Sequence, residues 1–83
     1  MIHEAELIES VLGEIAKAAK RYGPPASSHE SYGVLCEEVA ELFDAIRSND
    51  LAQIKTEAVQ VAAVALRLAD ACLDEMFIKR SSK

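Results

Sequence analysis

Residues 58–69 read AVQVAAVALRLA, and this stretch decides which kind of fold the chain can adopt. Drawn as a helix, it is apolar on nearly every side, and no alternation of apolar and polar residues favours a strand. A helix that is apolar all round must be covered all round. Two companion helices from a chain of 83 residues cannot cover it completely, so a second copy is expected to supply the rest. The stretch therefore predicts an all-α protomer that assembles into a helical-bundle homo-oligomer, minimally a dimer.

The residues around this stretch divide the chain into helical segments. Gly23 can take the left-handed conformation that ends a helix. Ser27 and Glu30 then have the spacing of a capping box, and Asp50 and Gln53 repeat that spacing before the apolar stretch. The whole chain, 1–83, is thus expected to form a single three-helix domain. We expect its helices over about residues 3–22, 28–47 and 51–77.

The composition argues against several classes of function. The net charge is −5, with only nine Lys and Arg, so no cationic face is expected to bind a nucleic acid polymer. Cys36 and Cys72 lack the spacing of a disulfide framework or a zinc site and are expected to be small, partly buried side chains in a reducing cytoplasm. No signal peptide is apparent at the N-terminus, and the nearly apolar residues 58–72 are too few and too polar to span a bilayer. We therefore expect a soluble cytoplasmic protein that makes no use of a membrane.

Oxygen-bearing side chains lie at helical spacing in the pairs Glu38-x-x-Glu41 and Glu57-x-x-Gln60. Residues three apart on a helix lie on one face. At about 100° per residue, Glu38 and Glu41 are expected roughly 60° and 120° from the apolar stripe of their helix, whereas Glu37 points nearly opposite it. Two such helices side by side would aim three carboxylates and one amide at a common point, and an all-oxygen cluster suits Mg²⁺ or Mn²⁺. The pairs predict a metal site, and the metal suggests a phosphate-containing substrate.

Each of these residues also has a purely structural interpretation. Glu38 and Glu41 could form a solvated helix face, as charged residues commonly do. Glu57 is harder to explain in this way, because burial of an unpaired carboxylate is costly, although Arg67 or Lys55 of a neighbouring chain could neutralise it. Arg67 itself could make an inter-subunit salt bridge or contact a phosphate through its fork of N–H donors.

The combination of the two pairs resembles the signature of the MazG-like nucleotide pyrophosphohydrolases, an all-α superfamily with the motif EExxE followed by ExxD. The resemblance is carried by Glu37-Glu38-x-x-Glu41, a gap of fifteen residues, and Glu57-x-x-Gln60. It covers about residues 27–70 and includes the runs HESY at 29–32 and QVAAVALR at 60–67.

This resemblance implies a helical homo-oligomer, a dimer or a tetramer, that uses Mg²⁺ to hydrolyse a nucleoside triphosphate to the monophosphate and pyrophosphate. It implies that Glu38, Glu41 and Glu57 form the catalytic metal cluster, with Gln60 at the fourth ligand position. Three further residues are implied as phosphate or nucleotide contacts: His29, Lys55 and Arg67. His29 lies in the first turn of its helix, where it could instead help to cap that helix.

The chain departs from the family pattern at Gln60, where the usual ligand is aspartate. Glutamine offers a carbonyl oxygen but no negative charge. Two interpretations of function remain open. The chain is either a house-cleaning (deoxy)nucleoside triphosphate pyrophosphohydrolase, or a non-catalytic nucleotide-binding or regulatory module that kept the fold and lost the full metal chemistry.

Overall fold

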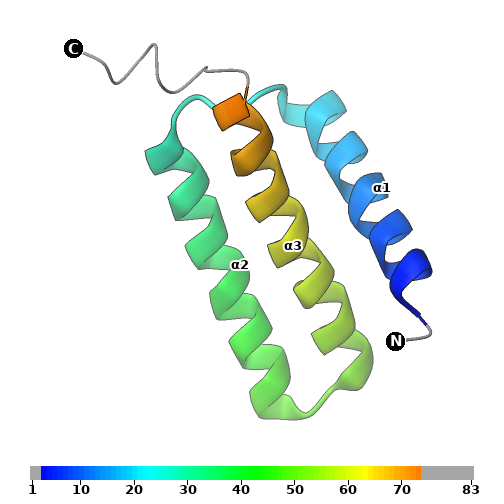
Figure 1. The fold of residues 1–83 in the computed structure, drawn as a ribbon. Coiled ribbons are helices and arrows are strands. Elements are labelled where there is room, and N and C mark those ends of the chain that lie inside the picture. Colours follow the sequence, from blue (N-terminus) through cyan, green and yellow to red (C-terminus); the bar gives the residue numbers. More distant parts are fainter. Residues whose placement is uncertain (1–2, 74–83) are drawn as a thin grey trace.

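The computed structural model describes residues 3–73, and these residues form three α-helices and no strand (Figure 1). The helices are α1 (Glu4–Tyr22), α2 (Ser28–Ser48) and α3 (Leu51–Leu73). For the described residues the all-α prediction is confirmed. The expected extension of the third helix to residue 77 lies outside them.

The loop between α1 and α2 is held by local hydrogen bonds of the kind its sequence predicts. Gly23 ends α1 at a positive φ of 71°, and its N–H donates to the carbonyl of Ala19. The Ser27 hydroxyl then accepts from the backbone N–H of Glu30 at 3.1 Å. The Glu30 carboxylate accepts in turn from the N–H of Ala26 at 2.7 Å, one residue earlier than in a standard capping box. This end of α2 is therefore fixed by its own sequence.

The turn between α2 and α3 leads into a residue that contacts the predicted metal site. Asn49 takes the left-handed conformation that closes α2, and the Asp50 carboxylate accepts from the N–H of Gln53 at 3.2 Å. The side chain of Gln53 does not turn back to complete a capping box. It donates instead to Glu57 at 2.9 Å, so the start of α3 helps to orient a residue of the predicted metal site.

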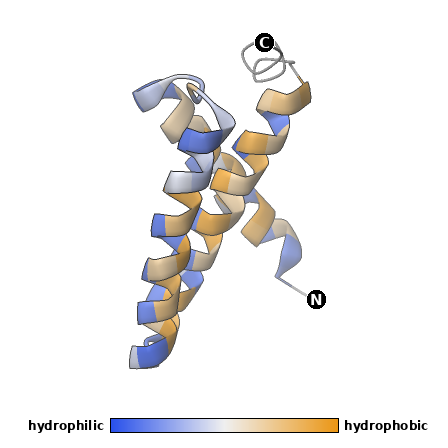
Figure 2. Ribbon diagram, turned by 90° about the vertical axis from the view of Figure 1, so that its left-hand side faces the viewer, coloured by the Kyte–Doolittle hydropathy of each residue, from blue (hydrophilic) through white to orange (hydrophobic). Residues whose placement is uncertain are grey.

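α3 is the central helix, with α1 on one side and α2 on the other (Figure 1). Seen from the side, α1 diverges from the more closely aligned pair of α2 and α3 (Figure 2). The apolar core is small and lies where α1 meets α3. Its main cluster is Val11, Val59 and Ala63, with Ile15 and Ala62 packed against them, and Ala45 and Ala71 are buried outside this cluster.

α2 turns a different side inward from the one that its apolar residues suggest. The expected apolar stripe was Leu35, Val39, Leu42 and Ile46. Leu35 and Leu42 are half-buried as expected, but Val39 and Ile46 are 46% and 50% exposed. The least exposed residues of α2 are instead Ser31, Leu35, Glu38, Leu42 and Ala45. The two buried positions of α2, Ser31 and Ala45, carry small side chains of the kind that permit close helix packing, and the larger Val39 and Ile46 lie on the flank. Glu38 therefore lies near the middle of the buried side and not roughly 60° away from it.

One side of α3 is not covered by any other part of the chain that the structure describes. The exposed apolar residues on that side are Ala58, Ala65, Leu66, Ala69, Cys72 and Leu73. The expectation that one chain cannot cover this helix completely thus holds for the described residues. Cys36 is also exposed, so the expectation of partly buried cysteines is wrong for both thiols. None of the described helices is long and apolar enough to cross a membrane.

Candidate metal centre

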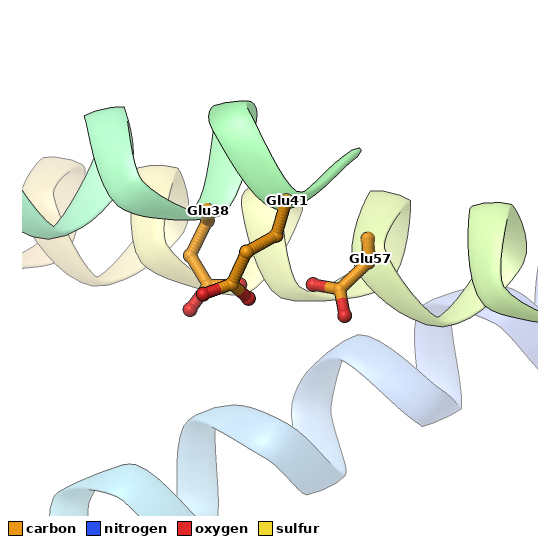
Figure 3. Close-up of side chains that lie close together, drawn as sticks. All are labelled: Glu38, Glu41 and Glu57. Atoms are coloured by element: carbon orange, nitrogen blue, oxygen red, sulfur yellow. The ribbon is translucent and has the colours of Figure 1, made fainter. Parts of the chain in front are cut away.

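Glu38, Glu41 and Glu57 lie together in the structure, with one carboxylate oxygen of each within 4.8 Å of the other two. Glu38 and Glu41 project from neighbouring turns of α2, and Glu57 comes from α3 (Figure 3). All three side chains point to the side of the α2–α3 pair on which α1 lies (Figure 3). The expected convergence is therefore present for the three carboxylates, whereas the contact shown for the Gln60 amide is with Glu14 of α1.

Among the described residues, no cationic side chain forms a salt bridge with the cluster. Burial raises the pKa of the Glu38 carboxyl, and the nearby charges of Glu41 and Glu57 raise it further. Glu37 adds only a smaller charge effect and is exposed, as expected from its angle. This arrangement therefore favours either protonation of one carboxylate or binding of a cation among the three.

The two carboxylate oxygens of Glu57 differ in their hydrogen bonds. Its Oε2 atom accepts from the Gln53 side chain at 2.9 Å. Its Oε1 atom is buried and makes no hydrogen bond within the part of the chain that the structure describes. A buried oxygen without a donor is costly, and a cation can satisfy it. Three carboxylates supply the kind of oxygen ligands that Mg²⁺ and Mn²⁺ prefer.

The raised pKa of Glu38 makes a prediction for the metal-free protein in EDTA. A carboxyl whose pKa is raised by folding stabilises the fold below its ordinary value of 4.5, and this contribution is lost as the pH rises through the raised value. We expect Glu38→Gln to be more stable than the wild type at about pH 7.5, with the difference shrinking towards about pH 5. Urea denaturation of both proteins at the two pH values measures this difference. A difference independent of pH would contradict the prediction.

Gln60 contacts α1. Its Nε2 atom donates to Oε1 of Glu14 at 2.8 Å, and the other Glu14 oxygen accepts from Nζ of Lys17 at 3.2 Å. The hydrogen bond from Gln60 is the main cause that lowers the pKa of Glu14, followed by the one from Lys17. Sequence reasoning did not single out Glu14. Its only signal is its place between Val11 and Ile15, on the side of α1 that packs against α3.

The three expected substrate contacts lie in different places. His29 is exposed in the first turn of α2, nine residues and therefore about 13 Å along the helix from Glu38. Lys55 borders a groove of about 310 Å³ between α1 and α3, which Lys17 and Gln60 also line. At about 100° per residue, Lys55 projects from α3 on nearly the opposite side from Glu57, two residues later.

Arg67 has a structural partner within the protomer. Its guanidinium donates to the backbone carbonyl of Gly23, at the end of α1. This bond fastens the C-terminal end of α1 to the second half of α3. The two roles expected for Arg67, a phosphate contact and an inter-subunit salt bridge, are not among its contacts in the described residues.

Comparisons of the chain with models of known protein families, with curated proteins and with solved structures find no match.

Proposed function

We propose that this chain is a Mg²⁺-dependent nucleoside triphosphate pyrophosphohydrolase, which converts a (deoxy)nucleoside triphosphate to the monophosphate and pyrophosphate in a house-cleaning role. The observation that carries the proposal is the convergence of three carboxylates, one with a buried and unpartnered oxygen. The resemblance to the MazG-like signature supports the choice of reaction. When bound, Mg²⁺ or Mn²⁺ would neutralise the carboxylates, stabilise charge on the phosphate oxygens and make a water more acidic.

Three carboxylates from two helices would coordinate the cation. Glu38 and Glu41 present two carboxylates from adjacent turns of α2, and Glu57 presents a third from α3. Gln53 holds one oxygen of Glu57, which keeps the other oxygen directed away from that bond. The side chains on two different helices thus supply a preorganised set of acceptors.

The substrate is proposed to be a polyphosphate. An acidic site attracts such an anion only when a bound cation supplies positive charge. A chain of net charge −5 would repel a polyphosphate unless bound metal and local lysines reverse the field. Lys55, in the groove that Gln60 also lines, is the proposed contact for the phosphates. His29 and Arg67 remain proposed contacts for the rest of the nucleotide or its phosphates.

The direct test is a panel of ribo- and deoxyribonucleoside triphosphates incubated with Mg²⁺ or Mn²⁺. We expect equal amounts of monophosphate and pyrophosphate from at least one of them, and neither product in EDTA. Chromatography of the nucleotides together with an enzymatic pyrophosphate assay measures both products. Release of inorganic phosphate alone, or of nothing from any triphosphate, would contradict the proposal.

A second candidate function is a non-catalytic nucleotide-binding or regulatory module. The observation that favours it is the neutral side chain of Gln60, whose nitrogen is already bonded to Glu14. Such a module would bind a nucleoside triphosphate in calorimetry with Mg²⁺ and release no product from it. The same panel therefore separates the two candidates.

We also propose that the protein is a homo-oligomer, a dimer or a tetramer, joined through the exposed side of α3. Ala65 lies within that side, so Ala65→Arg is expected to place a charge in the interface and give monomers at micromolar concentration. Light scattering after size exclusion measures the mass. Ala16→Arg, at an exposed position of α1 near Glu9 and Lys20, is the matched control and should leave the mass unchanged. A monomeric wild type would contradict the prediction.

A further inference from the structure

The amide at position 60 faces an acid on another helix. Gln60 Nε2 and Glu14 Oε1 are 2.8 Å apart, across the contact of α1 and α3. An ionised carboxylate can only accept, so the amide must present its N–H to Glu14 and turn its carbonyl oxygen away. Gln60 lies one turn after Glu57 on the same side of α3, and Glu57 belongs to the three-carboxylate cluster. The orientation of the Gln60 carbonyl is thus determined by a residue outside that cluster.

Glu14 is itself held in place. Its second oxygen accepts from Lys17, and its side chain is 29% exposed. Val11 and Ile15, on either side of it in the helix, pack in the core against α3. Each of its two oxygens thus accepts from a different donor, Gln60 on α3 and Lys17 on α1. The bond to Gln60 therefore comes from a fixed point on α1.

We propose that Glu14 is a positioning residue for the metal centre: it holds the Gln60 amide by its nitrogen and so leaves the carbonyl oxygen as a neutral fourth ligand for a divalent cation. This inference rests on the proposed function, because it needs a cation at Glu38, Glu41 and Glu57. It also explains why position 60 carries an amide and not an acid. A carboxylate at position 60 would be repelled by the carboxylate of Glu14. Glu14 and Gln60 thus form a matched pair of acceptor and donor.

The test is the affinity for Mn²⁺ alone, measured without nucleotide by calorimetry or from the free-ion paramagnetic signal. Glu14→Ala removes the acceptor and is expected to weaken Mn²⁺ binding by about tenfold or more, as the loss of a group that orients a ligand commonly does. Glu14→Gln keeps a carbonyl oxygen that can accept from Gln60, so its affinity should stay close to that of the wild type. Glu9→Ala, an exposed acid on the same helix, is the control for lost charge and should change little.

The outcomes separate this inference from the proposed function. If Glu38→Gln abolishes Mn²⁺ binding while Glu14→Ala binds like the wild type, the metal site stands and the inference is wrong. An equal loss in Glu14→Ala and Glu14→Gln would also overturn it, because the charge and not the orientation would then matter. A wild type that binds no Mn²⁺ would overturn both proposals.

A reciprocal exchange keeps the test decisive where Glu14→Ala fails to fold. The double variant Glu14→Gln with Gln60→Glu retains a hydrogen bond between the two positions with donor and acceptor reversed. It should bind Mn²⁺ more tightly than Gln60→Glu alone, in which two acids face each other. Equal or weaker binding by the double variant would overturn the inference.

Discussion

Replacing Glu38 by glutamine is expected to lower the rate of pyrophosphate release by about a hundredfold or more. The loss of a direct metal ligand should cost at least as much as the loss of a group that merely orients one, for which 10–100-fold is common. Glu38 lies closest to the middle of the buried side of α2 and feels the charges of both Glu41 and Glu57. A neutral amide there removes the negative charge through which the cluster would attract a divalent cation.

The neighbouring residue provides a matched control for this variant. Glu37→Gln removes the same charge from an adjacent, exposed position of α2, outside the three-carboxylate cluster. We expect its rate to stay within about threefold of the wild type, as exposed charges contribute little. Rates are compared under saturating Mg²⁺, after thermal melting has shown that both variants are folded. Equal activity of Glu38→Gln and the wild type would refute the assignment of the cluster as the catalytic centre.

The helix ends could be predicted from the sequence because they are decided locally. Ser27 with Glu30, and Asp50 with Gln53, form their cap contacts within a few residues, so no distant part of the chain is needed to place them. The shared face of Glu38 and Glu41 on α2 could be predicted for a similar reason, whereas their meeting with Glu57 depends on how α2 packs on α3. Spacings of three residues bring side chains to one face of each helix, whatever the helices pack against.

The rotation of α2 and the role of Glu14 depend on packing and could not be predicted in the same way. Val39 and Ile46 look like core residues by their chemistry, but the small Ser31 and Ala45 decide which side approaches α3. Glu14 is separated from Gln60 by 46 residues, and only the register of α1 on α3 brings them to 2.8 Å. A helical pattern fixes the face of a residue but not its height along a neighbouring helix.

Addition of Mg²⁺ or Mn²⁺ to the metal-free protein is expected to raise the free energy of unfolding by about 2.7 kcal/mol when the free ion reaches a hundred times its Kd. For a domain of this size, that corresponds to a rise in Tm of about 10–20 °C. The cause is that only the folded chain assembles Glu38, Glu41 and Glu57 within reach of one ion. Thermal melting at fixed protein concentration and ionic strength measures the shift.

Glu57→Gln distinguishes a specific site from general screening of negative charge. Without metal, this variant should melt above the wild type, because it removes one of three neighbouring acids, whose buried oxygen has no hydrogen-bond partner among the described residues. With metal, it should melt below the wild type, because it has lost a ligand. Screening alone depends only on net charge and ionic strength. The variant would then keep the higher melting temperature at every ion concentration. A crossing of the two melting curves with rising Mg²⁺ therefore requires an ion held by Glu57 itself, and parallel curves would rule that site out.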